Sequence, residues 1–423
     1  MNSRVLLLAT TTGYQTRMFA EAAAALDIEL VYATDCCEHL DDPWRDGAIP
    51  VRFHEEWRSV DAILKALDQR PVSGVVVVGD RPSVLAACVA RLLHLPGHPP
   101  QAAAIARDKR LSRERLRAAG LPVPEFFAVP AATDPGTLLP RVAFPVVIKP
   151  TVLSGSRGVI RANDALSFVT AFERVRRLLV SSDVQELRDA EADVIQIESY
   201  LPGAEYALEG VMEHGRLHTL AMFDKPDPLD GPFFEETIYV TPSRADAAVQ
   251  LRIQDVVARA AQAIGLHHGP VHAECRVNSS GVYVMEVAAR PIGGLCAKAL
   301  RFVKPGEPSV GLEHLLLRLA LGEPVGEWQR EPDASAVMMM PIPRSGVFRG
   351  VAGVDLAKAV AGVDDVLVTA KPDQHLVALP EGASYLGFIF AHGPTPEAAE
   401  QSVREAHGRL VVSIEPWLEV LPQ

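Results

Sequence analysis

Two strand-like runs joined by a short turn constrain the fold of this chain most strongly. Val271–Val277 and Val282–Ala288 are rich in valine and contain alternating apolar and polar side chains, and Asn278, two serines and Gly281 lie between them. This pattern predicts an antiparallel β-hairpin with a tight turn. The fold must therefore contain a sheet in which these two strands are neighbours.

Each predicted strand carries a glutamate. Counting outward from a turn centred on Ser279–Ser280 places Glu274 and Glu286 side by side on one face. Like charges directly opposed destabilise a sheet unless something neutralises them. Two explanations are open: a hard cation such as Mg²⁺, which binds one or two carboxylates together with phosphate oxygens, or solvated carboxylates offset by Arg276 and Arg290.

Alternation along each strand also predicts the neighbours of the two glutamates, because successive side chains of a strand point to opposite faces. Glu274 is expected to share its face with His272 and Arg276. Glu286 is expected to share its face with Val284, Ala288 and Arg290.

A second informative stretch is an apolar run that ends in a lysine and leads to a glycine loop. Pro145–Ile148 predicts a buried strand ending at Lys149, and Ser154–Gly158 follows before Val159. Glycine lets successive backbone N–H groups point at one anion, and serine adds hydroxyl donors. The loop can be a phosphate cradle beside Lys149, or a hairpin turn with a solvated Arg157. It is not the P-loop of mononucleotide enzymes, because no Gly-Lys-Ser/Thr follows.

Length and composition bound the class of protein. The chain has 423 residues, 48% of them hydrophobic and 22% charged, with a net charge of −12. These values are typical of a globular protein with about two to four domains. The acidic balance argues against nucleic acid as a partner, because phosphate backbones bind basic surfaces. No apolar run approaches the roughly 18 residues of a membrane span. We therefore expect a cytoplasmic enzyme that binds neither nucleic acid nor a membrane.

The cysteines are predicted to be reduced and structural. Their number is odd and their spacing is not that of a metal site. The short apolar run after Met1 does not have the pattern of a secretory signal, which agrees with a reducing compartment. The five cysteines are Cys36, Cys37, Cys88, Cys275 and Cys296.

The N-terminal part is predicted to be a doubly wound α/β domain. Val5–Ala9 and Leu30–Ala33 are of buried-strand type, and Met18–Leu26 between them is helical. The loop around Gly13 lacks the repeated glycines of a dinucleotide site. Gly74–Asp80 predicts a further central strand with a turn at its carboxyl end, where such sheets bind ligands.

Further elements follow from periodicity and turn residues. A basic helix is predicted over Ala102–Ala119, with most of its cations solvated, and a long loop over Phe223–Glu236. Helices are also predicted over Ala165–Leu179 and Leu251–Ile264 and from Thr395-Pro396 onward. The remaining predicted strands are Phe126–Val129, Val194–Leu201, Tyr206–Val211, Ala336–Ile342, Val366–Ala370 and Tyr385–Phe390.

Several separated motifs between Lys109 and Pro291 together resemble the ATP-grasp superfamily of carboxylate–amine ligases. Lys109 precedes the segment Ala119–Pro124, which resembles the family's "aGlpvP" motif, and Lys149 ends a segment VVIKP. The resemblance implies contacts with ATP from the following residues: Lys109, Lys149, Ser154, Gly155, Ser156, Gly158, Glu198, Tyr200, Leu201 and Glu205.

The same resemblance implies metal ligands and a catalytic arginine. Glu274 and Glu286 match the two metal-binding carboxylates, and Arg290 matches the arginine that steadies the transferred phosphoryl group and the acyl intermediate. Many relatives have asparagine two residues after the second carboxylate, where this chain has Ala288. This departure puts the second metal site in question. The implied cofactors are ATP and Mg²⁺, with Mn²⁺ as an alternative ion.

Three further segments are similar to bacterial L-amino acid ligases, which make dipeptides. They are Asp224–Asp227, Gly231–Glu236 and Glu286–Gly294. The similarity implies that Glu236 and Gly293 contact an amino acid substrate.

The resemblance implies an α/β fold with a Rossmann-like N-terminal domain over 1–100, an ATP-grasp domain over 101–300 with a lid at about 138–200, and a small C-terminal α+β domain over 301–423. The implied reaction joins a small-molecule carboxylate and an amine through an acyl phosphate and releases ADP and phosphate. Biotin-carboxylase-like activation of bicarbonate and a non-catalytic nucleotide-binding subunit are the alternatives. Relatives are commonly homodimers.

Overall fold

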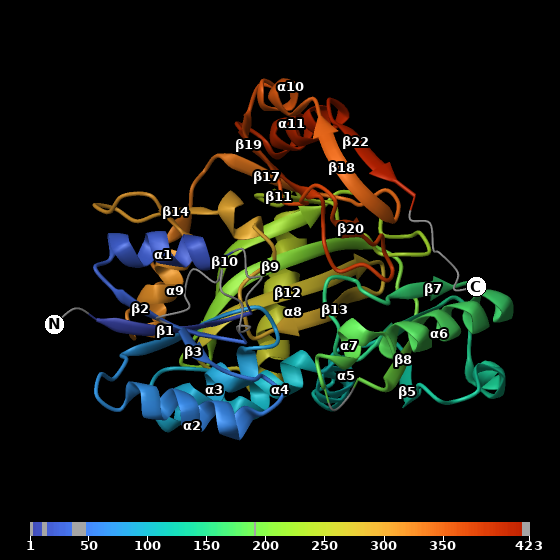
Figure 1. Cartoon of the computed structure of the whole chain (residues 1–423), viewed down its shortest axis with the longest axis horizontal. Coiled ribbons are helices and arrows are strands. Elements are labelled where there is room, and N and C mark those ends of the chain that lie inside the picture. Colours follow the sequence, from blue (N-terminus) through green and yellow to red (C-terminus); the bar gives the residue numbers. More distant parts are fainter. Residues whose placement is uncertain (1–2, 11–14, 36–47, 190–191, 417–423) are drawn as a thin grey trace.

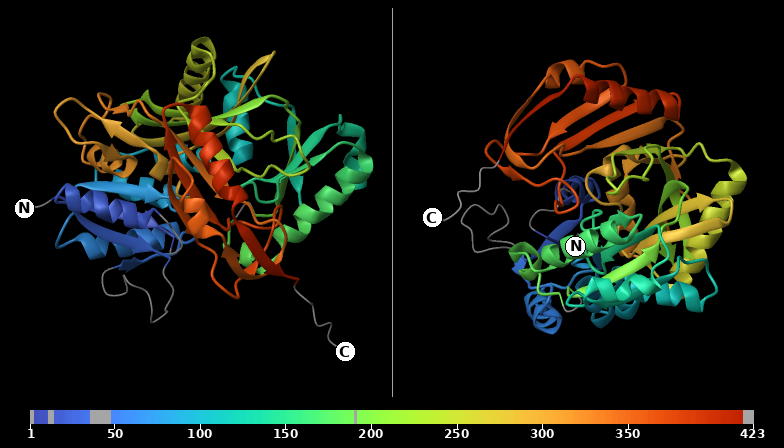
Figure 2. Two further views of the ribbon diagram at one scale, coloured as in Figure 1. Left: turned by 90° about the horizontal axis from the view of Figure 1, so that it is seen from above. Right: turned by 90° about the vertical axis from the view of Figure 1, so that its right-hand side faces the viewer.

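The computed structural model describes residues 3–10, 15–35, 48–189 and 192–416. The loop around Gly13 and the thiols of Cys36 and Cys37 lie outside the described residues. Figure 1 shows the N-terminal part at one side of a central sheet, a green α/β layer at the other, and the C-terminal part above. Figure 2 shows the same parts from two further directions.

The N-terminal part is a parallel sheet with helices on it, as the βαβ pattern predicts. Its strand order is β3-β2-β1-β4, and every pairing is parallel. Leu6 and Leu8 of β1 and Val77 of β4 belong to its apolar core. The elements are β1 (Arg4–Ala9), α1 (Thr16–Ala25), β2 (Glu29–Thr34), β3 (Ala48–Pro50), α2 (Glu56–Leu67), β4 (Gly74–Val78) and α3 (Ser83–Leu92).

The basic segment predicted as one helix forms two, α4 (Pro100–Arg107) and α5 (Lys109–Ala118). The break falls at Asp108, which has extended backbone dihedrals and accepts a hydrogen bond from the N–H of Leu111. An aspartate in this position caps the following helix. The break places Lys109 at the first turn of α5, at the edge of the cavity described below.

A second sheet is antiparallel, with the order β5-β8-β6-β7. The loop Ser154–Gly158 connects β6 to β7. Helix α6 covers one face, and its predicted bounds are confirmed. We call this sheet and the helices α6 and α7 the lid. Its elements are β5 (Phe126–Pro130), η1 (Pro135–Arg141), β6 (Val146–Pro150), β7 (Ile160–Ala162), α6 (Ala165–Leu179), α7 (Ser182–Gln185) and β8 (Val194–Ser199).

The central sheet has eight strands in the order β13-β12-β9-β10-β11-β17-β21-β19. The predicted hairpin is its edge pair, and three strands of the predicted C-terminal domain continue the same sheet. One face packs against α8 and α11, whereas the other lines the cavity. The elements are β9 (Ala204–Glu213), β10 (Arg216–Lys225), β11 (Ile238–Thr241), α8 (Ala247–Ile264), β12 (Gly269–Asn278), β13 (Gly281–Ala288), β17 (Ala334–Met340), β19 (Val363–Val368), β21 (Gly387–Gly393) and α11 (Pro396–Gly408).

Smaller elements complete the fold and form two three-stranded sheets, β15-β14-β16 and β20-β18-β22. They are η2 (Cys296–Ala299), β14 (Arg301–Val303), β15 (Val310–Gly311), α9 (Leu312–Ala320), β16 (Gln329–Arg330), β18 (Gly346–Ala352), α10 (Val354–Lys358), β20 (His375–Leu376) and β22 (Val411–Glu415). Among the described residues, no helix combines the length and the apolar character needed to cross a bilayer.

Candidate active site

A cavity of about 920 Å³ lies between the lid, the central sheet, the carboxyl end of β4 and a C-terminal segment. It gathers residues that are far apart in the sequence. Every residue with a predicted site role except Gly158 lines the cavity. These fourteen residues are Lys109, Lys149, Ser154, Gly155, Ser156, Glu198, Tyr200, Leu201, Glu205, Glu236, Glu274, Glu286, Arg290 and Gly293. Gly158 lies at the base of its loop, where a Cβ would meet Leu178 and Pro150.

Glu274 and Glu286 are direct partners in the β12–β13 pairing, as predicted, although the register set by the two-residue turn alone would place Glu274 opposite Met285. The register shifts between Glu274 and Cys275, because Met285 is an extra residue in β13. This β-bulge changes the alternation, so that Met285 and Glu286 both line the cavity. The expected shared face of Glu286 and Val284 is therefore wrong, since Val284 is buried in the apolar core on the other face.

The geometry of this pair suits a divalent cation. Glu286 lies 3.7 Å from Nζ of Lys109 and 4.0 Å from a guanidinium nitrogen of Arg290, which leaves its oxygens able to accept a cation. The cations near Glu274 all approach its Oε1. Each carboxylate thus has an oxygen for a hard ion such as Mg²⁺, which takes few protein ligands and fills its shell with water and phosphate oxygens.

A second group of carboxylates is already neutralised by a lysine. Oxygens of Glu205, Glu236 and Glu274 lie within 4.8 Å of one another, a spacing that could also hold a metal ion. However, Nζ of the buried Lys225 donates to all three, at 2.7, 3.0 and 2.7 Å. Lys225 thus occupies the centre of this group, whereas among the described residues no ammonium lies between Glu274 and Glu286 within hydrogen-bond distance of both.

The carboxylates around Lys225 titrate very differently. Burial raises the pKa of Glu236, and the neighbouring Glu274 raises it further, to about 7. Burial alone would also raise the pKa of Glu274, but Lys225 and His272 together outweigh it and hold that pKa well below its usual range. Glu236 therefore exchanges a proton near neutral pH, whereas Glu274 stays ionised.

Lys149 is held inside the lid by a buried charge network. Its Nζ donates to Glu198 Oε2 at 2.6 Å, and Arg113 of α5 donates to Glu198 Oε1 at 2.7 Å. Burial lowers the pKa of Lys149 to about 8, and Glu198 offsets this only in part. Burial would raise the pKa of Glu198, but Arg113 and Lys149 together lower it to about 2.

Arg113 joins this network to the hairpin. It donates to the carbonyls of Val284 and Met285 at 3.2 and 2.8 Å, and its side chain is completely buried. The expectation that most cations of the basic segment are solvated therefore fails for Arg113, which connects Lys149, through Glu198, to the carboxylate hairpin. Nothing in the sequence distinguished Arg113 from the arginines beside it.

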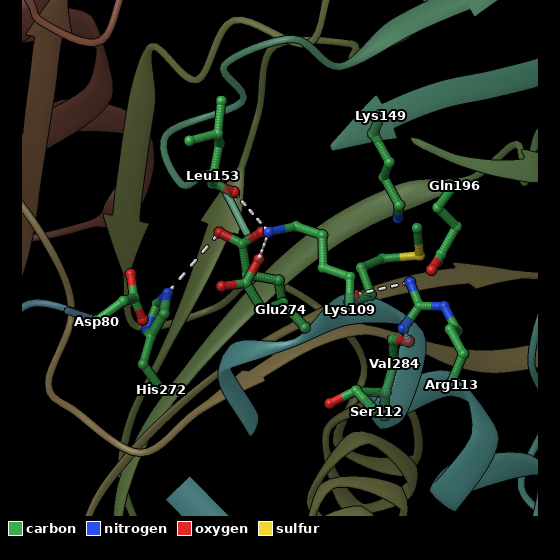
Figure 3. Close-up of polar contacts among 12 residues, drawn as sticks. Asp80, Lys109, Ser112, Arg113, Lys149, Leu153, Gln196, His272, Glu274 and Val284 are labelled. Atoms are coloured by element: carbon green, nitrogen blue, oxygen red, sulfur yellow. Dashed lines mark hydrogen bonds and ion pairs between the residues drawn. The ribbon is translucent and has the colours of Figure 1, made fainter. Parts of the chain in front are cut away.

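Lys109 and the glycine loop form another edge of the cavity. Lys109 donates from Nζ to the carbonyl of Leu153 at 2.6 Å, and its backbone N–H donates to Thr151. Figure 3 shows Lys109 reaching Leu153, with His272 pointing toward Glu274. Gly155 and Ser156 of the loop have positive φ values of 64° and 55°, a conformation that turns backbone N–H groups outward in succession.

Aromatic rings and Arg276 bound the end of the cavity at β8. Tyr200 and Phe234 have ring centroids 6.4 Å apart, and the Arg276 guanidinium lies over both. Arg276 also donates to the carbonyl of Leu201 at 2.7 Å and to Glu205 at 2.8 Å. The expected common face of His272, Glu274 and Arg276 is confirmed, because all three line the cavity.

The opposite end is bounded by Arg290 and the N-terminal part. Arg290 forms a bidentate ion pair with Asp80, with bonds of 2.9 and 3.1 Å. Burial would raise the pKa of Asp80, but Arg290 outweighs it and lowers that pKa. Asp80 ends the predicted strand Gly74–Asp80, so the expectation that this strand end borders a ligand site agrees with its place in the cavity wall.

His272 completes the wall between these ends. Its Nδ1 lies 3.1 Å from the buried Glu209, which also accepts from the N–H of Ile292. Burial would lower the pKa of His272, but Glu209 and Glu274 outweigh it and raise the pKa to about 9. The position of His272 on its strand could be predicted from the sequence. The role of Glu209 as its buried partner could not, because nothing in the sequence distinguishes Glu209 from other strand residues.

Comparisons with known proteins agree with this geometry. Residues 142–299 match an ATP-grasp domain, and residues 338–415 match the L-amino acid ligase C-terminal domain 2. The crystal structure of L-amino acid ligase from Bacillus licheniformis superposes with a TM-score of 0.82, covering 98% of this chain and 99% of that chain at 24% identity.

Sequence relatives match smaller parts of the chain. The Sinorhizobium fredii protein y4rH is 25% identical over 79% of this chain and 67% of its own length. Alanine–anticapsin ligase of Bacillus subtilis is 29% identical over 44% of this chain, and the match spans 41% of that ligase. The chain thus covers less than half the length of that ligase.

The chain thus combines an ATP-grasp domain with a C-terminal domain of the kind described for L-amino acid ligases. The predicted fold class is confirmed.

Proposed function

We propose that this protein is an ADP-forming ligase that joins the carboxylate of one amino acid to the amine of another, giving a dipeptide or an amino acid amide. The observation that carries the proposal is the pairing of Glu274 with Glu286 in one cavity with Lys109 and Lys149. Such a cavity can bring a cation, a nucleotide tail and a second substrate together.

A free carboxylate is a poor acylating agent, because its leaving group would be oxide. Transfer of the γ-phosphoryl group of ATP to that oxygen makes phosphate the leaving group and releases ADP. This transfer needs mainly alignment and charge neutralisation. Lys109, Lys149 and the N–H groups of Ser154–Gly158 would bind the phosphates, and Mg²⁺ on Glu274 and Glu286 would supply positive charge between them.

The amine nitrogen then attacks the acyl carbon and loses a proton, and phosphate leaves. Arg290 would stabilise the negative charge that develops in the tetrahedral intermediate. Its bidentate pair with Asp80 fixes the direction of the guanidinium. Glu236 and Gly293 would contact the amino acid substrate, with the buried Lys225 holding the Glu236 carboxylate in place.

The test is a phosphate-release screen of amino acid pairs with ATP and Mg²⁺, followed by mass analysis of the product. We expect one ADP, one phosphate and one amide per turnover for at least one pair. Glu286→Gln should abolish ADP release, whereas Glu114→Gln, on the exposed face of α5, should not change it. ATP turnover that needs bicarbonate instead of an amino acid, or wild-type turnover by Glu286→Gln, would contradict the proposal.

A further inference from the structure

A C-terminal segment reaches across the cavity to the lid. We call residues 378–385 the strap. The N–H of Gly158 donates to the carbonyl of Pro380 at 2.7 Å, and Nε of Arg157 donates to the carbonyl of Glu381 at 2.7 Å. Arg174 of α6 donates to both carboxylate oxygens of Glu381. The glycine loop and the lid helix are therefore both held by two successive residues of the strap.

The same strap forms part of the cavity wall at what we call the amino acid end, where Glu236 and Gly293 would contact the substrate. Ala383, Ser384 and Tyr385 line the cavity, and the Tyr385 ring lies 6.3 Å from that of Phe388. Pro380 and Glu381 lie inside a tight turn, shortly before these lining residues. The N–H of Gly382 donates to Ala378, and a Cβ at Gly382 would lie 2.0 Å from the carbonyl oxygen of Val377.

The tight turn holds Pro380 and Glu381 as one unit, and only Gly382, Ala383 and Ser384 separate Glu381 from Tyr385. Little chain is therefore available to absorb a displacement of Tyr385 before it reaches Glu381. The lid is also held to the N-terminal part, where Arg81 donates to the carbonyl of Leu187 at 3.2 Å. The glycine loop contacts Pro380 and Glu381 of the strap, and its Arg157 also pairs with Asp183 of α7 within the lid.

We propose that Glu381 is a positioning residue, which pairs with Arg174 to hold the glycine loop over the nucleotide only when the strap is seated at the amino acid end. This inference rests on the proposed ligase function. Its chemical purpose is to exclude water, because an acyl phosphate exposed to water hydrolyses and ATP is then used without forming an amide.

The test uses Glu381→Gln, Arg174→Gln and the charge exchange Glu381→Arg with Arg174→Glu in the full-length protein. Each single variant should bind a non-hydrolysable ATP analogue about three- to tenfold more weakly, the effect of losing one bidentate ion pair at a partly exposed site. In the presence of the analogue, the backbone N–H groups of residues 154–158 should exchange hydrogen faster in each single variant than in the wild type. The ratio of phosphate released to amide product formed should rise above one. The charge exchange should restore all three values.

Two matched controls accompany these variants. Glu405→Gln removes a glutamate that pairs with Arg409 on the solvent side of α11 and should change nothing. Gly382→Ala should reproduce the Glu381→Gln defects by deforming the strap, whereas Gly408→Ala, with no atom within 4 Å of the new Cβ, should not.

Single variants that bind the analogue, protect the loop and couple phosphate to amide as the wild type does would overturn the inference. A charge exchange that leaves the single-variant defects in place would also overturn it. Nucleotide binding and hydrogen exchange need no amide product, so they decide the role of Glu381 even if the wild type forms no amide and the proposed function fails.

Discussion

Glu274 and Glu286 face each other across β12 and β13 because the extra residue Met285 shifts the register of the hairpin by one residue. The bulge gives the cavity wall a methionine next to the carboxylates. The carbonyl of Met285, with that of Val284, accepts from Arg113, which in turn holds Glu198 and Lys149. One continuous set of contacts thus positions Glu274, Glu286 and Lys149.

Arg113→Met is expected to destabilise the protein. The substitution leaves the buried Glu198 with one cation fewer and removes the donors to two carbonyls. Breaking a buried ion pair in this way costs about 3–5 kcal/mol. Arg115→Met, at an exposed position of the same helix, should change the free energy of unfolding by less than about 0.5 kcal/mol. Urea denaturation of both variants checks the difference, and equal midpoints would refute it.

Nucleotide affinity is expected to fall as pH rises through about 8. Lys149 has a pKa of about 8, so above that pH it is increasingly neutral in the free protein. A bound phosphate favours the charged form, so binding above pH 8 must take up a proton and weakens by up to about tenfold per pH unit. Titration calorimetry with ADP between pH 7 and 9.5 measures this. Lys149→Arg stays charged and should remove the dependence; an unchanged slope in that variant would assign it to another group.

Gly158→Ala is expected to weaken nucleotide binding more than Gly155→Ala. Both glycines have positive φ values, 73° and 64°, so both substitutions carry the strain of the left-handed region, about 1–2 kcal/mol. Only at Gly158 does the new Cβ also meet neighbours, 2.9 Å from Leu178 and 3.0 Å from Pro150, whereas at Gly155 nothing lies within 4 Å. Equal ADP affinities of the two variants would show that packing at Gly158 does not shape the loop.

Lys225→Met is expected to make stability depend on divalent ions. Without the ammonium, Glu205, Glu236 and Glu274 repel one another in a buried site, a cost of about 3–5 kcal/mol. Mg²⁺ can replace that charge, so the melting temperature of the variant should rise with Mg²⁺ more than that of the wild type. Lys298→Met, which breaks a half-exposed pair with Asp365, provides the control. A variant that melts like the wild type in EDTA would contradict the role given to Lys225.

Local patterns allowed part of this structure to be predicted. The turn at Asn278 to Gly281 predicts the hairpin and brings Glu274 within one residue of the position opposite Glu286, and the bulge at Met285 completes that pairing. The Thr395 cap and Pro396 predicted the start of α11, where the Thr395 hydroxyl accepts from the N–H of Ala398. In both cases the signal lies within a few residues of its effect.

Other features depend on contacts between distant residues. Arg113 is one of several arginines on its helix, and only the approach of β8 and β13 buries it. Lys225 and Glu381 act through partners that lie far along the chain, Glu274 and Arg174, so no local pattern identifies them. The helix break at Asp108 has a local signal, because aspartate is a good N-cap residue. The helical pattern continues on both sides of Asp108, so this signal did not indicate a break.

The most direct test of the proposed reaction follows one oxygen atom. The carboxylate substrate is labelled with ¹⁸O, turned over with ATP, Mg²⁺ and the amine substrate, and the released phosphate is analysed by mass spectrometry. Activation through an acyl phosphate predicts one ¹⁸O atom in each phosphate and ADP as the nucleotide product. Unlabelled phosphate, or AMP in place of ADP, would contradict the account.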